Sequence, residues 1–266
     1  MLFRSKDLET RLSLRLCRRG RGGFALTAEG EQIYQETLRL LAGVDAFRSR
    51  VDEIHQRMGG ELHLAVFDKT ASNPTAQVGN AIALFKERAP DVALHLHVAP
   101  LNAIERGVLD GQFQVGIIPG HRSSSALSYH KLFEETMYLY CGQAHELFDS
   151  APKSEPRNWQ AMGRFPFAGL GYHSPNMELI QNVGLVRHAT GYDQESIATL
   201  ILSGQFLGFL PDHYAESFVR QLRMRAVRPD VFHYRCVFFS IVRTSPECAR
   251  VTKLFQHCLL QAHSSV

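Results

Sequence analysis

Two polar loops carry the side chains that are best suited to binding a small ligand. Residues 68–73 follow an apolar segment and precede a predicted helix, and residues 192–196 occupy the same position in a later part of the chain. The first backbone N–H groups of a helix have no partner within the helix, so loops of this kind can bind an anion or another polar group. The alternative is simple helix capping, for which Asn73 and Asp193 have suitable side chains.

Six side chains from these loops, and from the turn after a second predicted strand, form the candidate ligand site. They are Thr70, Ser72, Asn73, Asn102, Gln194 and Glu195. Ligands of open α/β sheets bind beyond the carboxyl ends of the strands, where these residues are predicted to lie. Glu195 and Asp193 argue mildly against a highly anionic ligand, whereas Lys69 argues the other way.

Histidines and acidic residues elsewhere form no recognisable catalytic or metal motif in the sequence. His95 and His97 share one face of a predicted strand, but no carboxylate or cysteine is paired with them, so ordinary strand histidines are the favoured interpretation. Glu134 and Glu135 are interpreted as a solvated turn rather than a catalytic pair. The nucleophile elbow, Walker loop, HExxH and GxGxxG motifs are absent from the sequence. We therefore expect a protein that is not an enzyme and that uses no metal or cofactor.

The first 27 residues are strongly basic. They hold seven Lys or Arg against two acidic residues, in a chain whose net charge is +3. A basic arm of this kind indicates a polyanionic partner, most often nucleic acid, or else a solvated charged face. The candidate DNA contacts are Arg4, Lys6, Arg18, Arg19 and Arg21. The glycines at positions 20, 22 and 23 predict that three of these arginines lie on a tight hairpin.

A long amphipathic helix is predicted over residues 28–58, with Thr27 as its N-cap. Apolar residues recur there at alternating spacings of four and three, which is a heptad pattern, and no proline interrupts it. The residues of the seam that we expect to pair two chains are Ile33, Leu40, Val44, Phe47, Val51 and Ile54. At 1.5 Å per residue such a helix is about 45 Å long. Packing of the seam on its own domain is the less favoured alternative, because the helix is so long.

From residue 61 onward, strands alternate with helices. Strands are expected at residues 62–67, 92–98, 115–118, 166–170, 185–189 and 206–210. Helices are expected to begin at Asn73-Pro74, Ser174-Pro175, Asp193 and Ser245-Pro246. This order predicts two α/β units with parallel strands and right-handed crossovers. The two polar loops then face one another across a cleft.

Composition limits the class of protein. The chain has 266 residues, of which 45% are hydrophobic and 21% are charged, as in ordinary globular proteins. No apolar run is long enough to span a bilayer, and no secretory signal is visible. Five scattered cysteines without a CxxC pair argue against a disulfide framework. A cytoplasmic protein is the expectation.

The segment from Leu8 to Gly30 resembles the signature of LysR-type transcriptional regulators, LExxLGxxLFxRxxRGxxLTxAG. It is LETRLSLRLCRRGRGGFALTAEG in this chain. The departures from the signature are Ser13, Cys17, Gly22 and Glu29. Four later segments also fit the family, at residues 109–111, 139–141, 145–148 and 204–211.

The resemblance implies an α/β fold with a two-lobed effector domain like that of type 2 periplasmic binding proteins. A partial winged helix-turn-helix (residues 1–27) and a dimerising linker helix (28–58) are expected to precede it. Lobe one is predicted at residues 60–138 and 240–266, and lobe two at 139–239. In the family, two further helices and the start of the recognition helix come before the matching segment. We therefore expect an incomplete DNA-binding domain in this chain, with weak and non-specific DNA binding.

The resemblance also implies a function. It predicts a homodimer or homotetramer that regulates transcription at promoter DNA in response to a small-molecule effector. The effector would bind between the lobes and favour one closure state. The alternative is a stand-alone cytoplasmic solute-binding protein with the same two-lobed fold. The heptad helix and the lack of a visible signal sequence argue against that alternative.

Overall fold

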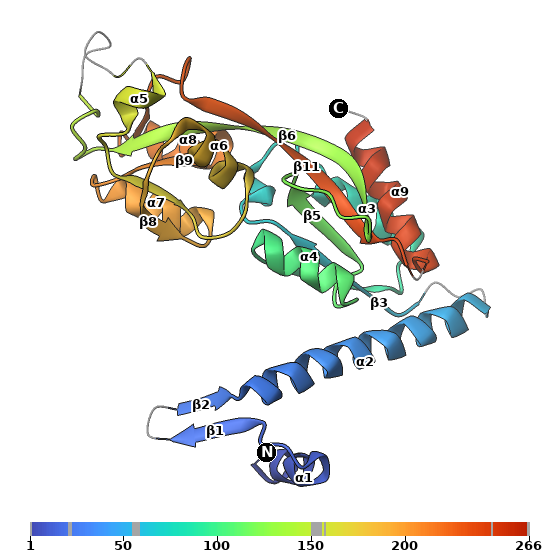
Figure 1. Ribbon diagram of the computed structural model, residues 1–266. Helices are drawn as coiled ribbons and strands as arrows, with labels where there is room; N and C mark the ends of the chain where they lie inside the picture. Colours follow the sequence, from blue (N-terminus) through green and yellow to red (C-terminus); the bar gives the residue numbers. More distant parts are fainter. Residues whose placement is uncertain are drawn as a thin grey trace.

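The computed structural model describes residues 2–20, 23–54, 59–149, 156, 158–245 and 247–264. Figure 1 shows a small N-terminal unit, a long helix and a large two-lobed body. The N-terminal elements are α1 (Leu2–Leu12), β1 (Cys17–Gly20), β2 (Gly23–Leu26) and α2 (Ala28–Ile54). None of the described helices is both long enough and apolar enough to cross a membrane.

Strands β1 and β2 form the predicted hairpin, with Cys17 opposite Leu26. The first helix ends at Leu12, because Ser13 has a φ of 52° and leaves the helical region. Leu16 is buried beyond that helix. The Thr27 hydroxyl accepts a hydrogen bond from the Gly30 N–H at 2.9 Å, which confirms the predicted cap of α2.

Helix α2 exposes its predicted seam. Leu40 and Phe47 are 68% and 67% exposed, and Val44 is 40% exposed. Ile33 and Val51 are partly exposed, while the side chain of Ile54 lies outside the described residues. The described residues of this seam therefore do not pack on the domain of their own chain. Residues 55–58 of the predicted helix lie outside the described residues as well.

One sheet runs through the whole body, in the order β4-β3-β5-β11-β6-β9-β7-β8, with β10 paired to β6. The strands are β3 (Glu61–Val66), β4 (Ala93–Val98), β5 (Val115–Pro119), β6 (Leu127–Gly142), β7 (Phe167–Leu170), β8 (Arg187–Gly191), β9 (Leu207–Pro211), β10 (Met224–Ala226) and β11 (His233–Arg243). Strand β3 is parallel to β4 and β5, and β7 is parallel to β8 and β9. The predicted parallel units are therefore present.

The long antiparallel strands β6 and β11 run through both lobes (Figure 1). Within the described residues, lobe one adds β3, β4 and β5 with three helices, and lobe two adds β7 to β10 with four. The helices are α3 (Val78–Arg88), α4 (Leu101–Leu109) and α9 (Arg250–Ser264) in lobe one, and α5 (Trp159–Met162), α6 (Pro175–Val183), α7 (Gln194–Leu202) and α8 (Asp212–Arg220) in lobe two. The lobe boundaries expected from the sequence fall inside β6 and β11, which both lobes share.

Two local predictions are wrong. No α-helix begins at Asn73-Pro74, because the Asn73 side chain accepts hydrogen bonds from the N–H and hydroxyl of Thr75 and closes a turn. A short 3-10 helix, η1 (Thr70–Ser72), precedes that turn, and α3 begins only at Val78. The last helix begins at Arg250 rather than at Ser245. The Cys248 thiol donates to the Arg243 carbonyl in the turn before that helix.

The strand expected at residues 92–98 is present as β4 (Ala93–Val98). Its apolar residues do not alternate between core and solvent, since Leu96 is 50% exposed and Val98 is 66% exposed. The reason is that β4 lies at the edge of the sheet, with β3 as its single neighbour. Helices α5 and α8 and strand β10 were not predicted.

Candidate functional site

The two polar loops meet across the lobes. The Lys69 ammonium lies 2.8 Å from the Glu195 carboxylate, and the Asp68 carboxylate accepts a hydrogen bond from the Gln194 N–H at 2.9 Å. The Tyr214 hydroxyl donates to Glu195 at 2.7 Å, and the Lys69 ammonium lies 4.5 Å from the centre of the Tyr214 ring. These contacts join the carboxyl ends of β3 and β8 with the first turn of α8.

The charges at this contact influence one another. Burial lowers the pKa of Lys69, but the hydrogen bond that Lys69 donates to Glu195 and the negative charges of Asp68 and Asp193 outweigh it and raise the pKa overall. Hydrogen bonds from Lys69 and Tyr214 lower the pKa of Glu195. Hydrogen bonds from Ser196 lower the pKa of Asp193. The contact is therefore ionic at neutral pH, with more carboxylates than cations.

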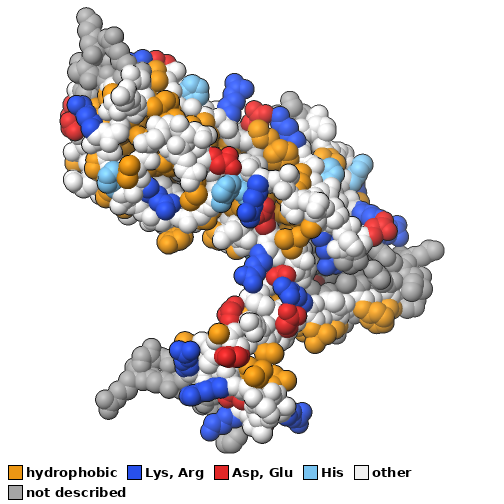
Figure 2. Space-filling model, in the orientation of Figure 1, with side chains coloured by type: hydrophobic (Ala, Val, Ile, Leu, Met, Phe, Trp, Pro, Cys, Tyr) orange, Lys and Arg blue, Asp and Glu red, His pale blue; other side chains and the backbone are white. Residues whose placement is uncertain are grey.

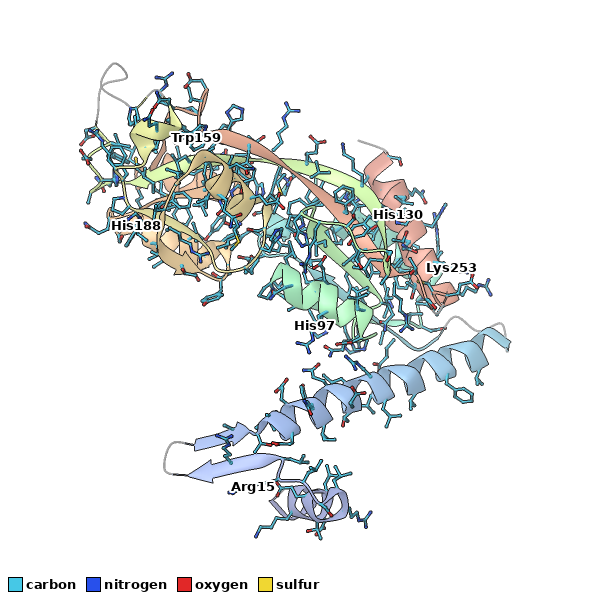
Figure 3. All side chains as sticks on the ribbon, viewed as in Figure 1. Arg15, His97, His130, Trp159, His188 and Lys253 are labelled. Carbon is cyan, nitrogen blue, oxygen red and sulfur yellow. The ribbon has the colours of Figure 1, made fainter. Side chains whose placement is uncertain are left out.

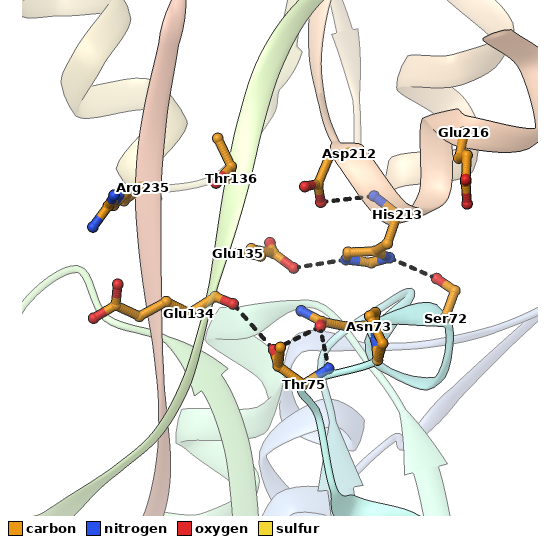
Figure 4. Close-up of a pocket in the computed structure, with 11 residues that line it drawn as sticks. Ser72, Asn73, Thr75, Glu134, Glu135, Thr136, Asp212, His213, Glu216 and Arg235 are labelled. Atoms are coloured by element: carbon orange, nitrogen blue, oxygen red, sulfur yellow. Dashed lines mark hydrogen bonds and ion pairs between the residues drawn. The ribbon is translucent and has the colours of Figure 1, made fainter. Parts of the chain in front are cut away.

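A cleft of about 750 Å³ lies beside the paired strands β6 and β11 (Figure 4). Both lobes line it, through the turn after η1 in lobe one and the start of α8 in lobe two. The lining residues are Ser72, Asn73, Pro74, Thr75, Glu134, Glu135, Thr136, Asp212, His213, Glu216 and Arg235. Four carboxylates face one arginine and one histidine there, which suits a ligand that carries positive charge or hydrogen-bond donors.

A hydrogen-bonded chain crosses this cleft (Figure 4). Ser72 Oγ lies 3.0 Å from His213 Nδ1, and His213 Nε2 lies 3.1 Å from Glu135 Oε2. The side chains of Glu135 and His213 are only 6% and 7% exposed. Burial raises the pKa of Glu135. The interpretation of Glu134 and Glu135 as a solvated turn is therefore wrong, because both lie in β6 and Glu135 is buried.

The structure separates the six predicted ligand residues. Ser72 and Asn73 line the cleft, while Gln194 and Glu195 lie at the interlobe contact. The buried Thr70 hydroxyl donates to the Phe67 carbonyl of its own loop. Asn102 lies in the exposed first turn of α4, and its side chain accepts from the Ala103 N–H. Thr70 and Asn102 are therefore not among the residues that line the cleft.

Two buried polar groups between the loops have no hydrogen-bond partner among the described residues. They are Gln194 Oε1 and the Tyr172 hydroxyl, and these residues are 2% and 8% exposed. Burial, together with the charges of Asp68 and Asp193, raises the pKa of Tyr172, so the hydroxyl keeps its proton and can donate. Tyr172 was not predicted from the sequence, because it follows the end of β7 and Gly171 and has no motif of its own.

The basic N-terminal unit presents part of the predicted DNA-binding set. Lys6 and Arg18 are exposed, as are Arg11 and Arg15. Figure 2 shows Lys and Arg side chains on this unit, away from the two-lobed body. The side chains of Arg4 and Arg19, and the whole of Arg21, lie outside the described residues.

The fold and the cleft define a two-lobed ligand-binding domain attached to a long helix. Residues 55–262 match the family model described as the LysR substrate binding domain. The chain is 36% identical over 237 residues to the HTH-type transcriptional activator BauR of Pseudomonas aeruginosa, an alignment that covers 89% of this chain and 77% of BauR. The chain belongs to the LysR family of transcriptional regulators.

Other similar proteins agree with this family. The chain is 27% identical to the probable HTH-type transcriptional regulator LrrA of Synechococcus elongatus, over 62% of this chain and 53% of LrrA. Full-length CbnR in complex with its target DNA has the same fold, with a TM-score of 0.63, 18% identity, and coverage of 97% of this chain and 88% of CbnR. The effector-binding domain of QuiR in complex with shikimate has a TM-score of 0.65 at 10% identity, over 78% of this chain and 98% of that domain.

Proposed function

We propose that this chain regulates transcription in response to a small polar metabolite that binds between its two lobes. The observation that carries the proposal is the pair of buried, unpartnered groups, Gln194 Oε1 and the Tyr172 hydroxyl, beside the interlobe contact. A buried polar group without a partner costs free energy, which a ligand recovers by hydrogen bonding to it. The effector-binding domain of QuiR, which has the same fold, is solved in complex with a small molecule, shikimate.

Each lobe contributes to the proposed site. Lobe one offers Ser72 and Asn73, with Thr70 holding their loop, and lobe two offers Gln194 and Glu195. A ligand that contacts both lobes binds the closed arrangement more tightly than the open one, so it shifts the population toward closure. Asn102, the remaining predicted ligand residue, makes no described contact across the lobes and is not included in the proposed site.

DNA contact is assigned to the N-terminal unit. Arg4, Lys6, Arg18, Arg19 and Arg21 are proposed to contact phosphate groups. CbnR, which has the same fold over 97% of this chain, is solved with its target DNA. We propose regulation rather than catalysis, in the cytoplasm, where promoter DNA is accessible.

Pairing of two chains is assigned to α2. Its seam residues Ile33, Leu40, Val44, Phe47, Val51 and Ile54 follow a heptad pattern. Since Leu40 and Phe47 are two-thirds exposed in the single chain, association would remove considerable apolar surface from water. A homodimer or homotetramer is the proposed assembly.

Thermal unfolding in the presence of a metabolite panel tests the ligand site. The panel contains amino acids, diamines and hydroxylated carboxylic acids, and a compound that binds raises the melting temperature. Gln194→Leu should abolish the rise for that compound, whereas Gln181→Leu, at an exposed position of α6, should leave it unchanged. A compound whose effect survives Gln194→Leu binds elsewhere and contradicts the proposed site.

Chromatin immunoprecipitation of the protein from its host tests the regulatory role. Weak enrichment of promoter DNA without one shared base sequence is expected, because the proposed phosphate contacts position the protein but read no sequence. A monomeric protein with no promoter enrichment, but with a saturable ligand, would favour the alternative of a stand-alone solute-binding protein.

A further inference from the structure

Three side chains with metal-binding atoms lie together on the outer edge of lobe one. Glu61 and His63 are two residues apart on β3 and share one face of that strand, and His95 is the register partner of His63 on β4. Each residue offers one possible ligand atom, and these three atoms all lie within 4.8 Å of one another. His63 is 29% exposed at its side chain, and Glu61 and His95 are 57% and 44% exposed. An ion can therefore reach the cluster directly from solvent.

The spacing of these atoms suits a tetrahedral metal ion. Glu61 Oε2 lies 3.2 Å from His63 Nε2 and 3.6 Å from His95 Nε2. Zinc takes ligands at 2.0–2.2 Å, which places neighbouring tetrahedral ligand atoms about 3.3–3.6 Å apart. The first measured distance lies just below that range and the second at its upper end, so the spacing of the carboxylate oxygen from each imidazole is compatible with one ion.

We propose that Glu61, His63 and His95 form a binding site for Zn²⁺ or a related divalent transition metal. The carboxylate oxygen Oε2 and the two Nε2 atoms are the ligands, and water occupies the fourth position. Two imidazoles and one carboxylate suit zinc, nickel and copper better than magnesium or calcium. The site is separate from the interlobe cleft and does not depend on the function proposed for it.

Metal binding requires one local rearrangement. The rings of His63 and His95 are stacked, with centres 4.4 Å apart and planes 10° apart. An imidazole nitrogen binds a metal in the plane of its ring, and two parallel rings cannot both point at one ion. At least one ring must turn about χ2, a soft torsion with a broad distribution. His97 continues the row on the same face, with its ring centre 5.9 Å from that of His63, and is not needed for the three-ligand set.

A metal ion at this position would stabilise the outer edge of the sheet. Strand β4 is the edge of the sheet, held by β3 as its single neighbour, so a metal bridging the two strands stabilises this edge. His97, on β4, lies on the side of lobe one that faces α2 (Figure 3). Helix α2 contacts the same lobe through Arg39 and Asp110, 3.0 Å apart. Bound metal would therefore stiffen the lobe next to the junction with the long helix.

Isothermal titration of the full chain, free of any polyhistidine tag, with Zn²⁺ alone tests the site. The wild-type protein should bind one more equivalent of Zn²⁺ than either His63→Ala or His95→Ala. Glu61→Gln should weaken binding at least tenfold, because even the loss of an outer partner of a metal ligand costs 10–100-fold. His257→Ala, at an exposed position of α9, is the matched histidine control and should bind as the wild type does.

Two further measurements keep the result interpretable. Circular dichroism of each variant establishes that its fold is intact, and Mg²⁺ replaces Zn²⁺ in a parallel titration, where no such uptake is expected. Equal Zn²⁺ uptake by the wild type, His63→Ala and His95→Ala would overturn the proposal. Loss of uptake in His97→Ala with retention in His63→Ala would also overturn the assigned ligand set.

Discussion

Glu135 is a buried carboxylate at the point where the two lobes share a strand. It lies in the middle of β6, and its carboxylate contacts His213 across the cleft, with Nε2 of His213 3.1 Å from Oε2. Burial opposes ionisation, so the pKa of Glu135 lies above its ordinary value of 4.5. A residue with this property resists losing its proton in the folded protein but not in the unfolded chain.

The replacement Glu135→Gln should therefore change stability in a pH-dependent way. As the pH rises from 4.5 through the raised pKa of Glu135, the unfolded chain binds fewer protons than the folded protein, and the free energy of unfolding falls. Glutamine has no such titration and can still hydrogen-bond His213. The variant should gain stability relative to the wild type as the pH increases, measured by urea unfolding between pH 4.5 and pH 7.

Glu134→Gln is the matched control, one residue away on the same strand. A hydrogen bond from Lys131 lowers the pKa of Glu134. The contribution of Glu134 to the pH dependence of stability therefore has the opposite sign to that of Glu135. The Glu134 carboxylate contributes stability above its ordinary pKa, and that contribution is lost as the pH falls through the lowered pKa. If the pH-dependent change in the free energy of unfolding, relative to the wild type, had the same sign in both variants, burial of Glu135 would not be its cause.

At the scale of secondary-structure elements, α2 depends on close contact with the hairpin that precedes it. Its first turn carries Gly30, where a Cβ atom would lie 2.0 Å from the Leu16 carbonyl oxygen. That oxygen also accepts the Thr27 N–H at 3.0 Å. Only glycine allows both contacts, which explains the glycine at the end of the family signature.

Gly30→Ala should separate the hairpin from α2 at a cost of about 1–3 kcal/mol, as is typical of overpacking. Hydrogen exchange at the Thr27 amide should accelerate. Gly43→Ala on the same helix has open space around the new methyl group and should stabilise the helix by about 0.5–1 kcal/mol. Unchanged exchange at Thr27 in Gly30→Ala would contradict the proposed contact.

The exposed seam of α2 predicts the effect of charged substitutions on assembly. Leu40→Lys combined with Phe47→Lys removes two apolar side chains, each worth about 1.5–3 kcal/mol when fully buried. The dimer dissociation constant should rise by at least about 100-fold in analytical ultracentrifugation. Gln35→Lys, which places the same charge beside Glu31 on another face of the helix, should have no such effect.

At the scale of the whole molecule, the interlobe contact holds the described arrangement of the lobes. Lys69 links the two lobes through Glu195, and Tyr214 adds a second hydrogen bond to that carboxylate. The strands β6 and β11 continue through both lobes, so closure can be lost without unfolding either lobe. The equilibrium between open and closed states is the property on which a ligand would act.

Lys69→Met should shift this equilibrium toward the open arrangement. The radius of gyration of the ligand-free protein in small-angle X-ray scattering should increase, while circular dichroism stays unchanged. Lys131→Met is the control, because Lys131 pairs with Glu134 three residues away on its own strand. An equal radius for wild type and Lys69→Met would show that this ion pair does not hold the lobes together.

The sequence alone was sufficient for features with local causes. The order of strands and helices, the N-caps at Thr27, Ser174 and Asp193, and the hairpin all follow from periodicity and turn chemistry within a few residues. The heptad pattern of α2 is local in the same sense. These features are repeated in the structure with shifts of a few residues at their ends.

Only the tertiary structure decided which distant residues meet. The burial of Glu135 beside His213, the contact of Lys69 with Glu195 and the pairing of His63 with His95 join segments tens of residues apart. Strand order and register set those contacts, and both depend on how the whole apolar surface is buried. No local pattern records the result, which is why His95 looked unpaired in the sequence and has a carboxylate and a second imidazole beside it in the fold.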